Sequence, residues 1–302
     1  MNFNQLKKDI DKLKKEKNAI LLVHNYQREE IQKIADILGD SLDLSRKAQQ
    51  IPNQTIVFCG VRFMAETAKI LSPEKTVLLP QPNASCPMAA MADIKSLQKL
   101  KAENPEAVVV TYINSTAEVK AESDVCCTSA NAINVVQNIK ARQIIFTPDK
   151  HLASWVQRFT DKSIIPWDGY CYVHDQFTVD EVMQAREAHP DSVVMVHPEC
   201  QKGVADLADH VLSTSGMVRM ARESKASVFV VGTEEGMLYR LKKENPDKQF
   251  FSLGTPKTCR GMKVTRIQDV YHALHENRFE IKLDTALMDR ARSALEGMLT
   301  YV

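Results

Sequence analysis

The sequence predicts an α/β fold of three homologous αβα three-layer domains, with short parallel sheets around a pseudo-threefold axis. Two observations predict this fold. Short apolar runs alternate with helix-like segments along the chain, which is typical of parallel sheets with helices on both faces. Several motifs also recur at a spacing of about 86 residues, which indicates an internal repeat.

The repeat is clearest in three cysteines that stand in polar loops containing Gly or Pro. Cys86, Cys171 and Cys259 are separated by 85 and 88 residues. Polar clusters at the ends of apolar runs recur at a similar spacing, which is 86 residues from Tyr26 to Tyr112. These clusters are His24-Asn25-Tyr26, Tyr112-Ile113-Asn114 and His197-Pro198-Glu199. Three hydroxyl residues follow at spacings of 88 and 85: Ser41, Ser129 and Thr214. Because these sets are independent, triplication explains them better than chance does.

Each repeat predicts the same elements in the same order. A strand such as AILLV ends in the polar cluster, and a helix-like segment follows it in the first two repeats. A second strand, clearest as SDVCC and HVLS, leads to the hydroxyl residue, which we expect to cap the next helix. A third strand such as TIVF precedes an amphipathic helix, and a fourth such as TVLL precedes the cysteine loop.

These elements place the αβα repeats at residues 1–87, 88–173 and 174–260. Residues 261–302 should form two C-terminal helices, the second from Thr285 onward, that pack on the repeats. Because the sequence has no linker or low-complexity tract between the units, we expect them to pack tightly.

The composition excludes several classes of protein. Lys and Arg number 39 against 38 Asp and Glu, so no bulk charge favours nucleic acid or an anionic membrane. The sequence has no run of 18 apolar residues and its polar start does not resemble a secretory signal, so we expect a cytoplasmic protein without a membrane span. Seven cysteines without any CxxC pair argue against a disulfide framework and a zinc ribbon. Four of them should only pack: Cys59, Cys126, Cys127 and Cys200.

The three loop cysteines predict the chemistry. Ligands bind at the carboxyl ends of strands in open parallel sheets, so three repeats around one axis would direct their polar clusters and cysteines to one cavity. Three cysteines are one short of a structural zinc site, but they suit an iron–sulfur cluster whose fourth iron stays open. An open iron can bind a substrate oxygen as a Lewis acid and help water to leave, which predicts a dehydration or condensation.

Side chains near this cavity would supply the rest of the chemistry. Groups available for acid–base catalysis are His24, Tyr26, Tyr112, His197 and Glu199. The three hydroxyl residues should lie at helix N-termini, where backbone N–H groups favour carboxylates or phosphate. The site therefore suits a small substrate with several negative charges.

The sequence resembles the quinolinate synthase family of iron–sulfur enzymes, which act in NAD biosynthesis. The resemblance rests on ordered motifs over nearly the whole chain, including HNYQREEIQKIADILGDSLDLSRKA, FCGVRFMAETAKIL, YINSTAEVKAESDVCCTSAN, VHPEC and GTEEGMLYRLKKENPDKQF. It implies condensation of iminoaspartate (iminosuccinate) with dihydroxyacetone phosphate to quinolinate, phosphate and two waters. It also implies functional coupling to an aspartate oxidase or dehydrogenase that produces iminoaspartate.

The same resemblance implies roles for individual residues. One 4Fe–4S cluster with one open iron would have three ligands, Cys86, Cys171 and Cys259. The substrate cavity would be lined by His24, Ser41, Tyr112, Asn114, Ser129, His197, Glu199 and Thr214. The acid–base candidates would be Tyr26, His174 and Glu199.

Two positions depart from the family pattern. Some members carry CxxCxxC at the third ligand, whereas here the segment is Cys259-Arg260-Gly261-Met262, so we expect no disulfide switch among extra thiols. We would expect a proline after the second ligand, but Tyr172 stands there.

Two other functions stay open from the residues alone. An electron-transfer protein could hold a three-cysteine cluster, although it would not need the ring of hydroxyls and histidines. A non-enzymatic sensor of small anions could bury the cysteines without iron. Single residues also have ordinary structural interpretations, because His24 could end a strand and Glu199 could pair with Lys202.

Overall fold

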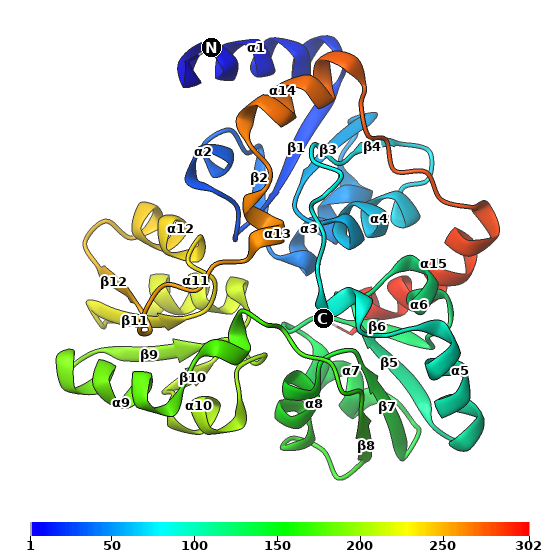
Figure 1. Cartoon of the computed structure of the whole chain (residues 1–302), viewed down its shortest axis with the longest axis vertical. Coiled ribbons are helices and arrows are strands. Elements are labelled where there is room, and N and C mark those ends of the chain that lie inside the picture. Colours follow the sequence, from blue (N-terminus) through cyan, green and yellow to red (C-terminus); the bar gives the residue numbers. More distant parts are fainter. Residues whose placement is uncertain (1, 302) are drawn as a thin grey trace.

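The computed structural model describes residues 2–301 and confirms the predicted fold class. Three lobes surround a common centre (Figure 1), and each contains a four-stranded sheet with helices packed on it. The strand orders are β2-β1-β3-β4, β6-β5-β7-β8 and β10-β9-β11-β12, which is one topology used three times. All pairings between these strands are parallel.

The units contain equivalent helices and strands. The first has α1 (Phe3–Glu16), β1 (Ala19–His24), α2 (Glu29–Gln32), β2 (Ile37–Gly39), α3 (Ser41–Gln50), β3 (Thr55–Cys59), α4 (Arg62–Leu71) and β4 (Thr76–Leu78). The second has α5 (Ile94–Glu103), β5 (Val108–Tyr112), α6 (Ala117–Ala121), β6 (Val125–Cys127), α7 (Ala132–Asn138), β7 (Gln143–Thr147), α8 (Lys150–Gln157) and β8 (Ser163–Pro166). The third has α9 (Val179–Ala188), β9 (Val193–Val196), α10 (Lys202–Leu207), β10 (His210–Val211), α11 (Thr214–Glu223), β11 (Val228–Gly232), α12 (Met237–Glu244) and β12 (Gln249–Ser252).

Further helices follow the cysteine loops and close the chain. Two short 3₁₀ helices, Met88–Ala90 and His174–Gln176, come just after Cys86 and Cys171. The C-terminal helices are α13 (Arg260–Lys263), α14 (Ile267–Glu276) and α15 (Thr285–Thr300). The sequence predicts α14 and α15 but misses α13, and it also misses α10, which gives the third unit the same helix as the other two.

Strand register shows which residues are equivalent. The first and second strands of the units pair Leu22 with Ile37, Val110 with Val125, and Met195 with His210. The offsets between units are therefore 88 and 85 residues. This register makes His24, Tyr112 and His197 equivalent, so counting 86 residues from Tyr26 to Tyr112 paired the wrong positions. Tyr26 corresponds instead to Asn114 and Glu199.

An aspartate before the second strand makes the same contacts in every unit. The carboxylates of Asp36, Asp124 and Asp209 accept the backbone N–H of a first-strand residue at 2.8, 2.7 and 2.8 Å. The backbone N–H of the same aspartates donates to that residue's carbonyl at 3.2, 3.1 and 2.9 Å. Each contact ties the start of the second strand to the first, which supports the triplication.

A lysine before the fourth strand is also repeated. The ammonium groups of Lys75, Lys162 and Lys248 donate to backbone carbonyls at the C-terminal ends of α3, α7 and α11. The last carbonyls of a helix lack partners within it, and a cation also interacts favourably with the negative end of the helix dipole. Each lysine therefore stabilises a helix end and joins it to the fourth strand.

Replacing Lys75 by Met should destabilise the first unit. Lys75 is buried and donates to Ala48 O at 2.8 Å and Ile51 O at 2.7 Å, so Met would leave buried acceptors short of a donor. We expect a loss of about 1–3 kcal/mol, measured by urea unfolding. The matched control is Lys225→Met, which changes an exposed lysine. An unchanged unfolding curve for Lys75→Met would contradict this interpretation of the repeated lysines.

The expected helix caps are wrong. Asp40 caps α3 and Ser213 caps α11, each accepting backbone N–H groups of the first turn, so Ser41 and Thr214 are the first residues inside their helices. Ser129 lies before Asn131, the residue that precedes α7. The cap must have extended backbone geometry with its side chain turned back onto the helix, and the residue one position earlier meets this requirement in two of the units.

The C-terminal helices connect the units. Helix α14 packs against α1, and α15 packs against α4, α6 and β6 (Figure 1). One apolar core joins the first two units with α15 and includes Leu22, Phe146 and Leu295. The third unit has further clusters of its own, around Phe229 and Phe177. Among the described residues, every helix is too short or too polar to cross a bilayer.

Candidate active site

A cavity lies between the three units, at the carboxyl ends of their strands. The structure brings every predicted site residue to this cavity: His24, Tyr26, Ser41, Cys86, Tyr112, Asn114, Ser129, Cys171, His174, His197, Glu199, Thr214 and Cys259. The position of each is thereby established, while its role stays a prediction.

The three loop cysteines reach the cavity from equivalent loops. In each unit, a backbone N–H after the third strand donates to the carbonyl two residues before the cysteine: Arg62 N to Ala84 O at 2.9 Å, Lys150 N to Gly169 O at 2.8 Å, and Glu235 N to Lys257 O at 3.0 Å. All three thiols are free. The same loop geometry, repeated in the three units, therefore presents one sulfur from each.

The cysteine loops also contact one another. A Cβ on Gly261 would lie 2.0 Å from the carbonyl oxygen of Ser85, so only glycine allows the loops of Cys259 and Cys86 to approach this closely. The Tyr172 hydroxyl accepts the backbone N–H of Arg260 at 2.7 Å, which joins the loops of Cys171 and Cys259. The tyrosine that replaces the expected proline thus links two of the loops.

Burial raises the pKa of all three thiols, that of Cys86 to about 12. The protein alone therefore does not favour thiolates here, and a bound metal would supply the missing positive charge. The remaining cysteines pack elsewhere, with Cys126 and Cys127 in the core shared by the first two units, Cys59 against α14, and Cys200 in the third unit.

Glu199 is the centre of a buried polar network. Its Oε2 lies 2.6 Å from His174 Nδ1 and 3.3 Å from His197 Nδ1, and Asn114 Nδ2 donates to its Oε1 at 3.4 Å. Burial alone would raise the pKa of Glu199, but attraction to His174 and His197 outweighs it and holds the pKa well below its usual range. Glu199 is therefore a carboxylate at neutral pH.

The network continues from His174 to Tyr26 through a residue that the sequence interpretation missed. His174 Nε2 lies 2.8 Å from Thr233 Oγ1, which lies 2.6 Å from the Tyr26 hydroxyl. If His174 Nδ1–H donates to Glu199, its Nε2 is free to accept a proton. Burial, with a smaller contribution from Glu199, raises the pKa of Tyr26, so the phenol stays protonated and can donate along this chain.

Burial lowers the pKa of both histidines at the ends of the first strands, His24 and His197. Burial, with a smaller contribution from the charge of a protonated His197, lowers the pKa of His24 to about 3. His24 Nδ1 accepts the Tyr26 backbone N–H at 3.2 Å, so its proton is on Nε2. His197 Nε2 lies 3.1 Å from Ser129 Oγ, and burial lowers the pKa of His197 as well.

Comparison with known proteins decides the family. Residues 8–300 match the model of the family described as "Quinolinate synthetase A protein". The chain belongs to the quinolinate synthase family. It is 50% identical over 300 residues to the quinolinate synthase of Thermodesulfovibrio yellowstonii, covering 99% of both chains. It is 52% identical over 294 residues to that of Methanoregula boonei and 48% identical over 293 residues to that of Clostridium kluyveri, covering 97% of both chains in each comparison.

This member of the quinolinate synthase family has cavity residues that the sequence interpretation did not include. Thr233 and Glu234 follow the third strand of the third unit, and Glu234 and Asp40 line the cavity. The repeat could have indicated Glu234, because it aligns with Asp149 at the same point of the second unit. The sequence gives no sign that the side chains of Asp149 and Glu234 would be only 0% and 1% exposed.

The described residues also include a second set of side chains that could bind a metal. Ligand atoms of Cys171, His174 and Glu199 lie within 4.8 Å of one another. They could together hold a single metal ion, whereas a cluster would use Cys171 and leave His174 and Glu199 for proton transfer. The two arrangements predict different results when Glu199 is changed.

Proposed function

We propose that this enzyme condenses iminoaspartate with dihydroxyacetone phosphate to give quinolinate, phosphate and two waters. The atoms balance without an oxidant or a reductant, so the reaction calls for acid–base groups and a Lewis acid and not for an electron carrier. The observation that carries the proposal is the convergence of three free thiols, one from each unit, with the Glu199 network on one cavity.

The three thiols fit a 4Fe–4S cluster with one open iron. Cys86, Cys171 and Cys259 would hold it, and the contacts at Gly261 and Tyr172 would fix the spacing of their loops. When bound, the cluster would supply a Lewis acid for a substrate oxygen that leaves as water. Membership of the family and the three free thiols that line the cavity both support this cofactor.

Residues around the cavity would bind the anionic substrates. The proposed contacts come from His24, Ser41, Tyr112, Asn114, Ser129, His197, Glu199 and Thr214. Thr214 begins α11, whose positive end favours a carboxylate or phosphate nearby, whereas the N–H groups that follow Ser41 in α3 already pair with the Asp40 carboxylate. His24, as a neutral N–H donor, would bind an oxygen without adding charge.

Tyr26, His174 and Glu199 would move protons. The Glu199 carboxylate can orient His174 through Nδ1, and His174 Nε2 can accept a proton that reaches it from Tyr26 through Thr233. Burial keeps bulk water away from this path, which protects reactive imine and enol groups from hydrolysis.

The proposed substrate also indicates the preceding reaction. Iminoaspartate is the two-electron oxidation product of aspartate, so an aspartate oxidase or dehydrogenase must supply it. We propose that both enzymes act in the cytoplasm and that neither nucleic acid nor a membrane is a partner of this chain.

Anaerobic turnover tests the proposal. Protein prepared without oxygen should contain four irons per chain and form quinolinate only when iminoaspartate and dihydroxyacetone phosphate are both present. A dicarboxylate analogue should change the spectrum of the cluster, which it would not do in an electron-transfer protein that shields the cluster from substrate. Protein that takes up no iron would contradict the proposal and favour an anion sensor.

A further inference from the structure

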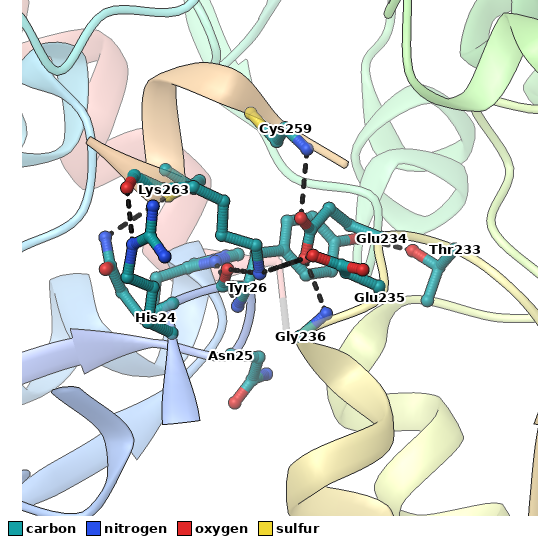
Figure 2. Close-up of polar contacts among 12 residues, drawn as sticks. His24, Asn25, Tyr26, Thr233, Glu234, Glu235, Gly236, Cys259 and Lys263 are labelled. Atoms are coloured by element: carbon teal, nitrogen blue, oxygen red, sulfur yellow. Dashed lines mark hydrogen bonds and ion pairs between the residues drawn. The ribbon is translucent and has the colours of Figure 1, made fainter. Parts of the chain in front are cut away.

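Glu234 is a buried acid at the junction of the third unit with the loop that carries Cys259. It is 1% exposed and lies just after β11. Its Oε1 accepts the backbone N–H of Cys259 at 2.9 Å, and its Oε2 accepts the backbone N–H of Gly236 at 2.7 Å (Figure 2). One carboxylate therefore fixes the backbone of a proposed cluster ligand against the end of a strand.

Lys263 extends this contact to the first unit. Its ammonium lies 3.0 Å from Glu234 Oε2 and donates to the backbone carbonyl of Tyr26 at 2.7 Å (Figure 2). Lys263 is itself 9% exposed, so the pair is largely shielded from water. Burial raises the pKa of Glu234, and the Lys263 ammonium and the two N–H groups oppose that rise.

The space around the pair is filled. A Cβ on Gly236 would lie 2.7 Å from Lys263 Nζ and 2.8 Å from the Tyr26 carbonyl oxygen, so only glycine permits this approach. The Gly236 carbonyl in turn accepts from Gln32 Nε2 of the first unit at 2.9 Å. The backbone at Tyr26 and at Cys259 is thus held by the same few groups.

The second unit has a related arrangement. Asp149 occupies the position of Glu234, with an offset of 85 residues, and is also fully buried. Its Oδ1 accepts the backbone N–H of Leu152 at 2.7 Å, and its buried Oδ2 has no hydrogen-bond partner. The first unit has Val61 at this position. A buried acid at this position therefore recurs, but Glu234 also accepts the backbone N–H of a loop cysteine and pairs with a lysine that reaches another unit.

We infer that Glu234 and Lys263 are positioning residues that set Cys259 and Tyr26 relative to each other, so that cluster binding and proton transfer share one geometry. The inference rests on the proposed function, because it takes Cys259 as a ligand and Tyr26 as a proton donor. Groups that orient metal ligands from behind typically change metal affinity about 10–100-fold when they are removed.

Iron release from the anaerobically loaded enzyme tests the inference. We compare Glu234→Gln and Lys263→Met with wild type by the rate at which a chelator removes iron, by the electron paramagnetic resonance spectrum of the reduced cluster, and by kcat and KM. The amide of Glu234→Gln would turn an N–H donor toward Gly236 or Cys259, so we expect about tenfold faster release, an altered spectrum and a lower kcat. Lys263→Met leaves the N–H groups of Cys259 and Gly236 bonded to Glu234, so we expect a lower kcat with a smaller change in the rate of iron release.

Two comparisons make the result decisive. Glu235→Gln makes the same change one position along, at a more exposed carboxylate 3.9 Å from Lys263, and should behave as wild type. Lys263→Met serves if Glu234→Gln fails to fold, because wild-type kcat and KM in folded Lys263→Met would contradict the inference. Wild-type release rate and spectrum in folded Glu234→Gln would overturn the inference alone, whereas wild-type protein that holds no iron would overturn the proposed function.

Discussion

Cys86→Ala, Cys171→Ala and Cys259→Ala should each lose the cluster and abolish quinolinate formation. Each variant removes one of three protein ligands, and the remaining two cannot keep three irons coordinated in a cavity that otherwise offers few thiols. We expect iron and sulfide per chain to fall to near zero after anaerobic reconstitution, together with the absorbance of the cluster.

Two other cysteines provide the control. Cys59→Ala and Cys127→Ala change fully buried thiols in apolar surroundings, so they should cost some stability but leave the iron content unchanged. Loss of iron in Cys127→Ala with retention in Cys171→Ala would show that the ligand set is wrong.

Glu199→Gln should keep the cluster and lower kcat about 10²–10⁴-fold. The carboxylate accepts from His174 at 2.6 Å and lies 3.3 Å from His197, so an amide would remove the charge that orients and polarises both imidazoles. The measurement is steady-state kinetics on protein whose iron content has been matched to wild type.

Glu187→Gln, an exposed change on α9, is the control and should have no effect. Iron content decides between the two metal arrangements at this site. If Glu199→Gln loses iron as completely as Cys171→Ala, then Glu199 is a metal ligand together with Cys171 and His174. If kcat stays at the wild-type value, Glu199 has no part in proton transfer.

Much of the site could be predicted because its residues follow strand ends at a fixed repeat. His24, Tyr112 and His197 end or follow equivalent first strands, so the repeat brought their polar clusters together, although the spacing count matched Tyr112 with Tyr26 and not with His24. The three loop cysteines stood out because polar loops offer them nothing to pack against. Both signals, the position at a strand end and the composition of the loop, depend only on neighbouring residues, so they can be seen in the sequence.

The residues that connect the units could not be predicted in this way. Gly261 meets Ser85, Tyr172 meets Arg260, and Glu234 meets Lys263 and Cys259, and all of these contacts join residues at least 25 positions apart in sequence. These contacts depend on how the units pack against one another, and the spacing of residues within one repeat does not predict that packing. The error over the helix caps has a similar origin, since Asp40 and Ser213 differ from their neighbours only in backbone geometry.

The repeated aspartates and lysines preserve a record of descent. Positions that build the frame are the same in all three copies, whereas the strand-end positions have diverged to His, Tyr and His. An ancestor of one unit, assembled as a homotrimer, would have presented three identical sulfurs to a single cluster. After gene fusion, each copy could have changed independently of the other two. The resulting asymmetric pocket would suit a reaction between two different molecules, because a symmetric pocket offers both of them the same contacts.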